Sequence, residues 1–204
     1  MQVASDLEEK KHASADAPVE DIILRRWSPR AFAERPVSDA DLKSIFTAAS
    51  WAASSYNEQP WRFLVGRKGD ETWQKIFDAL TPANQSWTKF APVLYATFAK
   101  KTFSHNGSPN RVAVHDVGAA SATLSLQATA LGLHTHGMAG FDPEKLRAAF
   151  GVPNDFEPVA CWALGYLGDP DILPENYKQM ELQPRTRKPL NQFVFNEWER
   201  AASL

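Results

Sequence analysis

The most regular hydrophobic pattern in this chain lies between residues 111 and 131. Apolar or small side chains recur there at spacings of three and four, at Val114, Val117, Ser121, Leu124, Ala128 and Leu131. This spacing predicts a helix. The remaining faces carry mostly glycine, alanine and serine, so we expect the helix to be buried all round.

A polar, glycine-bearing segment follows this predicted helix. Gly132 can adopt the left-handed conformation that ends a helix, and residues 134–140 read His-Thr-His-Gly-Met-Ala-Gly. We expect 134–140 to form a loop, and a loop held by a rigid element is a candidate functional site. The alternative is a core helix that ends in an ordinary turn.

Shorter patterns predict the other elements. Apolar runs bounded by proline or glycine predict strands at 61–65, 93–98 and 159–167. Helical spacing predicts helices at 39–53, 71–80 and 143–150. The third strand is apolar on both faces and is expected near the centre of a sheet. Strands separated by helices favour a layered α/β or α+β domain.

Composition narrows the class of protein. Hydrophobic residues make up 44% of the 204 residues, enough for a sizeable core. The net charge of -2 gives no sign of a nucleic-acid partner, and no run is long enough to cross a membrane. Residues 1–17 lack the apolar region of a signal peptide and are interpreted as a disordered polar tail. Residues 18–204 are then expected to form one domain.

The single cysteine, Cys161, lies in an apolar run. It cannot form an intrachain disulfide, which fits the reducing cytoplasm. We interpret it as a buried structural thiol, because no charged neighbour in the sequence would activate it.

Three polar segments are candidates for chemistry. Residues 25–30 read Arg-Arg-Trp-Ser-Pro-Arg, and residues 185–188 read Arg-Thr-Arg-Lys. Guanidinium groups offer paired donors to phosphate oxygens, so both segments suit a phosphate. Residues 54–61 read Ser-Ser-Tyr-Asn-Glu-Gln-Pro-Trp and could hydrogen-bond a polar ring or a sugar chain. Taken singly, each segment is better explained as a solvated surface or loop than as a site.

Other site types find little support in the sequence. There is no GxGxxG, no GxxxxGK[ST] and no GxSxG motif. His134 and His136 are too few to hold zinc without further ligands, and no CxxC or HExxH accompanies them. His115 lies on the predicted buried helix and is interpreted as a core histidine. The tryptophans are expected mostly in the core or an interface.

Taken in series, four segments resemble the FMN-dependent nitroreductase family. The segments are 26–32 (RWSPRAF), 54–61 (SSYNEQPW), 132–141 (GLHTHGMAGF) and 185–190 (RTRKPL). They follow the family's order, and the resemblance covers about residues 19–195. The resemblance implies an α+β, three-layer fold in which helices flank a mixed, mostly antiparallel sheet. It also implies a homodimer with C-terminal strand exchange and an FMN at each of two interface sites.

The resemblance assigns cofactor-binding roles to Arg26, Trp27, Ser28, Arg30, Ser54, Ser55, Asn57, Gln59, Asn84, Gly137, Met138, Ala139, Gly140, Arg185 and Arg187. The arginines and Ser28 would hold the phosphate and ribityl chain. Ser54, Ser55 and Asn57 would reach the flavin from the partner chain, with Gln59 shaping that loop. Residues 137–140 would lie over the ring, and Asn84 would contact its pyrimidine side.

The sequence also departs from the family pattern. Trp87 stands where some members place a lysine or arginine against the flavin, so charge stabilisation would come from Arg25 or Arg26. Residues 103–111 form only a short loop where well-studied members insert a helical roof over the substrate. Ala139 replaces a glutamate of some members.

The function implied by the resemblance is transfer of electrons from NADH or NADPH through FMN to a nitroaromatic, quinone or similar small acceptor. No side chain is assigned as an acid or base. Two alternatives stay open: another branch of the same flavin fold, such as a reductive dehalogenase or ring oxidase, and a non-catalytic flavin-binding dimer. The large apolar side chains of Phe193, Phe195 and Trp198 predict that residues 189–198 cross onto a partner chain.

Overall fold

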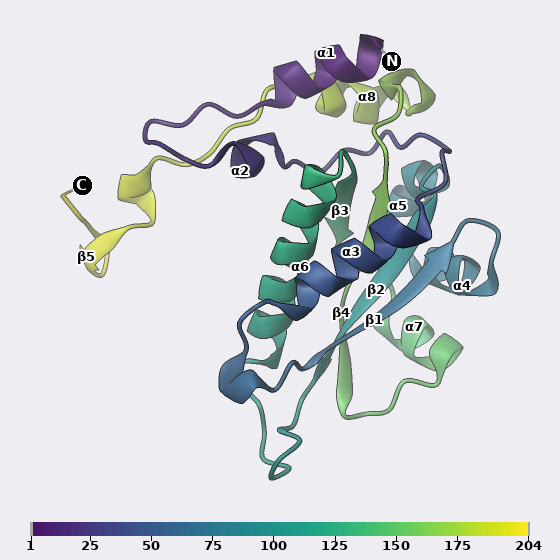
Figure 1. The fold of residues 1–204 in the computed structure, drawn as a ribbon, viewed down its shortest axis with the longest axis vertical. Coiled ribbons are helices and arrows are strands. Elements are labelled where there is room, and N and C mark those ends of the chain that lie inside the picture. Colours follow the sequence, from purple (N-terminus) through teal and green to yellow (C-terminus); the bar gives the residue numbers. More distant parts are fainter. Residues whose placement is uncertain (1, 204) are drawn as a thin grey trace.

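A computed structural model describes residues 2–203 of the chain (Figure 1). Its longer elements are α1 (Gln2–Lys11), α2 (Asp21–Arg25), α3 (Asp39–Ser50), β1 (Trp61–Arg67), α4 (Glu71–Ala79), α5 (Pro82–Thr88), β2 (Val93–Lys100), α6 (Ala113–Ala130), β3 (His134–Met138), α7 (Pro143–Phe150), β4 (Phe156–Gly165) and α8 (Glu175–Leu182). Shorter elements are η1 (Ser55–Asn57), η2 (Pro170–Ile172), η3 (Leu190–Gln192), β5 (Phe195–Glu197) and β6 (Arg200–Ala201).

A four-stranded sheet in the order β1-β2-β4-β3 forms the centre of the fold. Every neighbouring pair is antiparallel, in agreement with the mostly antiparallel sheet that was expected, and no parallel pair occurs among residues 2–203. β4 pairs with β2 on one side and β3 on the other, which confirms the central position predicted for 159–167. Tyr95, Trp162 and Gly137 lie in register across β2, β4 and β3.

The prediction of a loop over 134–140 was wrong for its first five residues. Residues 134–138 form β3 and pair with the end of β4. The segment His-Thr-His-Gly-Met has little β propensity of its own, and its strand conformation comes from pairing with β4. His134, Thr135 and Met138 are buried there. The site loop is therefore shorter, and its first residues lie on a rigid sheet edge.

Helices cover both faces of the sheet and give an α+β fold of three layers (Figure 1). On one face, Trp73 and Ile76 of α4 and Leu146 of α7 pack with Leu94 and Ala163 of the strands. On the other face, the α3 and α6 side chains that pack against the sheet are Leu42, Ile45, Val117 and Leu124. Both clusters consist of nearly inaccessible side chains, so the sheet is apolar on both sides.

Local sequence explains where several helices begin. The hydroxyl oxygen of Ser38 accepts a hydrogen bond from the Asp41 N–H, which confirms the predicted cap of α3. Asp70 and Asp142 cap α4 and α7 in the same way. α5 was missed because only seven residues form it, although Pro82 at its first turn is a typical start signal.

One face of α6 is open, contrary to the prediction of burial all round. Val114 is 47% exposed, and Gly118 and Ala122 on the same face are also exposed. The interpretation of His115 as a core residue was wrong, because its side chain is 81% exposed. The small side chains thus serve two purposes. Some let α6 approach α3 and the sheet, and others line a surface groove.

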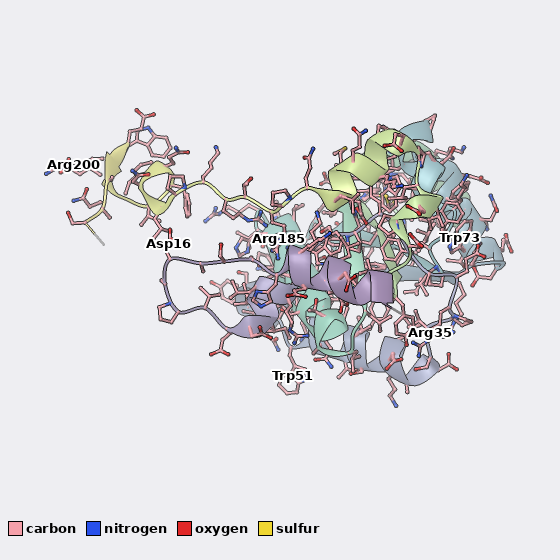
Figure 2. All side chains as sticks on the ribbon, turned by 90° about the horizontal axis from the view of Figure 1, so that it is seen from above. Asp16, Arg35, Trp51, Trp73, Arg185 and Arg200 are labelled. Atoms are coloured by element: carbon pink, nitrogen blue, oxygen red, sulfur yellow. The ribbon has the colours of Figure 1, made fainter. Side chains whose placement is uncertain are left out.

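The two ends of the chain differ. Residues 1–17 were expected to be a disordered tail, but residues 2–11 form α1, where Leu7 and Lys11 are 2% and 5% exposed. α1 lies beside α8 (Figures 1 and 2). The C-terminal residues instead extend away from the body, with Arg200 at the far end of the segment (Figure 2). Among residues 2–203, no helix is long and apolar enough to cross a bilayer.

Candidate functional site

A groove of about 600 Å³ lies along the open face of α6. Its lining residues come from α2 and the segment after it, from β2, β3 and β4, and from α6: Ile23, Arg26, Ser28, Thr97, Gly118, Ser121, Ala122, Ser125, Leu126, Gly137, Val159, Ala160 and Trp162. This volume is in the range of sites for small molecules and cofactors. The groove is mostly apolar, with Arg26 and Ser28 as its polar contributions from the segment that follows α2.

The guanidinium groups of Arg26, Arg185 and Arg187 lie close enough to influence one another, and Arg26 lines the groove. Burial and the charge of Arg187 lower the pKa of Arg26. Burial lowers the pKa of Arg185 as well, followed by the charges of Arg26 and Arg187. Among residues 2–203, none of the three forms an ion pair with a carboxylate. A cluster of like charges with no carboxylate partner among residues 2–203 suits an anion.

The backbone around the cluster fixes part of its geometry. Arg185 donates from Nη1 to the carbonyl oxygens of Lys11 (2.9 Å) and Leu24 (2.5 Å), so it is tied to α1 and α2. Arg187 is exposed and donates to the Thr186 carbonyl oxygen. Arg26 Nη1 lies 3.4 Å from the Ser28 hydroxyl. The Arg185 side chain is therefore held in place by hydrogen bonds to the backbone, whereas the Arg187 side chain is exposed to solvent.

Two residues predicted for this site point elsewhere. Arg30 lies over the ring of Tyr177, 5.2 Å from its centre, and does not line the groove. Trp27 is 5% exposed, with the Lys11 ammonium 4.9 Å from its ring centre. Both side chains pack against other parts of the protein and so help to hold residues 26–30 in place. In this chain, the predicted phosphate residues that meet are Arg26, Ser28, Arg185 and Arg187.

Gly137 and the residues after it form the β3 side of the site. Gly137 lines the groove, and a side chain there would meet the Trp162 ring at 2.8 Å. The Gly140 carbonyl oxygen accepts hydrogen bonds from Asn84 Nδ2 (2.9 Å) and the Thr81 N–H (3.0 Å). Asn84 therefore holds this loop in place. Ala139 is exposed, whereas Met138 is a core residue.

The 54–59 segment lies at the N-terminal end of α6, away from the arginine cluster. The Ser55 N–H donates to the buried carboxylate of Asp116 in the first turn of α6. The α6 residues that line the groove run from Gly118 to Leu126, so the far end of the groove lies ten residues, roughly 15 Å, beyond Asp116. Within one chain, residues 54–59 do not join the arginine cluster.

Unusual backbone conformations hold the 54–59 loop. Tyr56, Asn57 and Gln59 have φ near +50° (53°, 53° and 51°), which is costly for residues other than glycine. The Ser54 hydroxyl accepts from the Gln59 N–H, and the Glu58 carboxylate accepts from the N–H and hydroxyl of Ser104. Such strain is typical of segments that present groups to a ligand or partner.

Sequence reasoning missed several groove residues. Thr97, Ser121 and Ser125 bring hydroxyl groups, and Trp162 brings an indole whose Nε1 has no hydrogen-bond partner among residues 2–203. The signal available was the small-residue face of α6, which was interpreted as a packing surface. Trp162 was missed because it lies within an apolar strand, β4, and is not part of a polar motif. Within the described residues, no group of three or more His, Cys, Asp or Glu side chains could hold a metal.

Trp87 and His136 lie behind the site and not in it. Trp87 is 1% exposed and its ring lies 6.3 Å from Phe32 and 4.6 Å from the His136 ring. Trp87 is thus a core residue, and it does not face the groove where some nitroreductases are expected to place a cation. His136 Nδ1 donates to the Pro29 carbonyl oxygen at 2.8 Å and so supports the segment before Arg30.

Burial lowers the pKa of His136 from 6.5 to about 4. Between pH 4 and pH 6.5, the His136 imidazole is therefore protonated in the unfolded chain and neutral in the folded chain. The free energy of unfolding should fall as the pH falls from 6.5 to 4, by at most about 3 kcal/mol from this group. Urea unfolding at several pH values would measure it. His136→Gln should flatten the dependence, while His105→Gln, at an exposed position, should leave it unchanged.

The fold agrees with comparisons to known proteins. The chain belongs to the nitroreductase family, whose model matches residues 23–166. It is 38% identical over 142 residues to a 15.4 kDa protein from the ask 5′ region of Mycolicibacterium smegmatis, covering 66% of this chain and 94% of the relative. An Archaeoglobus fulgidus protein, provisionally named NADH dehydrogenase/NAD(P)H nitroreductase, is 30% identical over 72% of this chain and 84% of its own length.

Solved structures share the same fold. A crystal structure described as an oxidoreductase containing FMN has a TM-score of 0.85 and 36% identity, covering 91% of this chain and 95% of that chain. A nitroreductase family protein from Clostridium difficile 630 has a TM-score of 0.66 and 25% identity, covering 94% and 96%. These likenesses confirm the predicted family and the three-layer α+β fold.

Proposed function

We propose that this protein is a homodimeric FMN-dependent oxidoreductase that takes electrons from NADH or NADPH and passes them to a nitroaromatic, quinone or similar small acceptor. The observation that carries the proposal is the cluster of Arg26, Arg185 and Arg187, which has no acidic partner among residues 2–203 and borders a groove of about 600 Å³. A phosphate dianion would relieve the mutual repulsion of these charges. A related solved structure contains FMN.

The groove residues suit the different parts of FMN. Arg26, Arg187 and Ser28 would hold the phosphate, with Arg185 adding charge from its fixed position. The hydroxyls of Ser121 and Ser125 line the groove where a polar chain could pass, although each also donates within α6. Gly137 leaves room for a flat ring beside Trp162. When bound, FMN supplies the electron transfer itself, and the chain orients it and excludes water.

The separated 54–59 loop is the reason for proposing a dimer. Ser54, Ser55 and Asn57 lie far from the arginine cluster of their own chain, so they would complete the site of a partner chain. The exposed face of α6, with Val114, Gly118 and Ala122, would lie between the two chains. Small side chains there permit close approach of neighbouring backbones.

The first test is the identity of the cofactor. The purified protein is expected to be yellow, and acid should release FMN, because the two arginine-rich segments suffice for one phosphate group and the sequence lacks a Gly-rich loop for a pyrophosphate. Chromatography of the released flavin measures this. Recovery of FAD would contradict the proposed site, and a colourless protein that does not bind added FMN would contradict the function.

The second test is the kinetic mechanism. Donor and acceptor are expected to use one site in turn, so initial rates should give parallel double-reciprocal lines, the pattern of ping-pong kinetics. NADH or NADPH oxidation with and without a quinone or nitroaromatic measures the rates. Intersecting lines would contradict the shared site. Absence of any oxidation in a flavin-loaded protein would favour a non-catalytic flavin-binding dimer.

A further inference from the structure

Glu181, in the last turn of α8, is a charged residue in the core. It is 1% exposed, and its Oε1 accepts hydrogen bonds from the N–H groups of Arg30 (2.8 Å) and Ala31 (3.0 Å). Carboxylates are almost never fully buried unless they are paired. Burial raises the pKa of Glu181, while the two N–H groups and the charges of Arg30 and Lys11 act in the opposite direction. A buried carboxylate that accepts hydrogen bonds from two successive backbone N–H groups fixes the position of that backbone.

The segment that Glu181 grips has little structure of its own. Residues 26–30 contain no helix or strand, so other elements must fix their backbone. His136 on β3 donates to the Pro29 carbonyl oxygen, and Glu181 accepts from the next two N–H groups. Three successive residues are thus held by two side chains from β3 and α8. Ser28, which lines the groove, directly precedes them.

The same end of α8 also fixes the other half of the anion site. The ammonium group of Lys11 donates to the Gln183 carbonyl oxygen at 2.5 Å, and the Lys11 carbonyl oxygen accepts from Arg185. Lys11 is 5% exposed and places its charge over the Trp27 ring. A span of five residues, 181–185, therefore joins the segment that bears Ser28 to the fixed guanidinium of Arg185.

From this arrangement we infer that Glu181 is a positioning residue for the phosphate group of the flavin. Its grip on Arg30 and Ala31 sets the distance between the Arg26–Ser28 segment and Arg185. This inference rests on the proposed function, because it assumes that the cluster binds the FMN phosphate. Glu181 makes no contact with the ligand itself and acts through the backbone that it holds.

The sign of the effect separates positioning from simple electrostatics. Glu181 is an acid near an anion site, so removing its charge alone would strengthen anion binding or leave it unchanged. Positioning predicts the opposite for Glu181→Ala. The amides of Arg30 and Ala31 would lose their acceptor, and the site would loosen. Glu181→Gln keeps an oxygen at the same reach and should restore most of the binding.

The experiment compares FMN with riboflavin, which lacks only the phosphate. Flavin fluorescence titrations on the dimeric protein freed of flavin would give both dissociation constants. Glu181→Ala is expected to weaken FMN binding about tenfold, as when one charge-assisted contact is impaired, and riboflavin binding about twofold or less. Glu181→Gln should bind FMN within about threefold of the wild type. The matched control is Glu175→Ala, at an exposed acid in the first turn of the same helix, which should change neither constant.

Several outcomes would overturn the inference. A folded Glu181→Ala protein that binds FMN as tightly as the wild type, or more tightly, would do so. Equal losses for FMN and riboflavin would show a general structural role instead. If Glu181→Ala does not fold, Glu181→Asp replaces it. Its shorter side chain should lower the ratio of FMN to riboflavin affinity, and an unchanged ratio overturns the inference. A wild-type protein that does not prefer FMN to riboflavin would overturn the phosphate site of the proposed function as well.

Discussion

Replacing Arg26 and Arg187 together by alanine is expected to weaken FMN binding by about a hundredfold or more. Each charge-assisted hydrogen bond to a phosphate contributes about 1.5–3 kcal/mol, and two are removed. The losses should be less than additive, because Arg187 lowers the pKa of Arg26 and its removal relieves that repulsion. Arg187 is exposed and Arg26 lines the groove, so neither change opens a core cavity.

A matched control removes the same number of charges from neighbouring positions. Arg25 is paired with Asp21 and Lys188 is exposed, and neither lines the groove. The double variant Arg25→Ala/Lys188→Ala should bind FMN within about threefold of the wild type. Excess FMN should restore most of the turnover of the Arg26/Arg187 variant, because we propose that these residues act in binding and not in the chemical step. A folded variant that stays inactive at saturating FMN, or equal losses in test and control, would contradict this assignment.

The sequence was sufficient for most of the fold because its strongest patterns match what the structure buries. The 3.6-residue spacing found α3, α4, α6 and α7, and each packs its apolar side chains against the sheet. Apolar runs found β1, β2 and β4. The strand β3 was missed because its residues are polar and gain their conformation from pairing with β4. α1 was missed because few of its side chains are apolar, and its position depends on long-range contacts to residues 183 and 185.

The candidate site was only partly predictable for the same physical reason. Arg26, Ser28 and Gly137 were found from short motifs, and the structure brings them to one groove. Arg30 has the same chemistry as Arg26, but the backbone turns it towards Tyr177. Glu181 carries no motif at all, since its role comes from the distance that the fold sets to residues 30 and 31. The chemical groups that a site can offer are predictable from residue types. The direction in which a side chain points, and the contacts that hold it there, depend on tertiary structure.

Deleting residues 189–204 is expected to convert a dimer into a monomer with greatly reduced FMN affinity. Leu190, Phe193 and Trp198 are 54%, 56% and 88% exposed on a segment that extends away from the body (Figure 2). Burying three such side chains against a partner would contribute about 4–9 kcal/mol, or three orders of magnitude or more in the dimer dissociation constant. The body should stay folded, because the core clusters lie within residues 31–177.

Loss of the flavin follows from the geometry of the 54–59 loop. Because Ser55 is anchored to the far end of α6, a monomer would keep the arginine cluster but lack the loop that a partner supplies. Light scattering and FMN titration at micromolar protein would measure both effects. A double variant within the same C-terminal segment, Glu197→Ala/Arg200→Ala, removes an exposed ion pair and no apolar surface, so it should remain dimeric. A full-length protein that binds FMN as a monomer would refute the exchange, and a truncated protein that stays dimeric would place the interface on α6 alone.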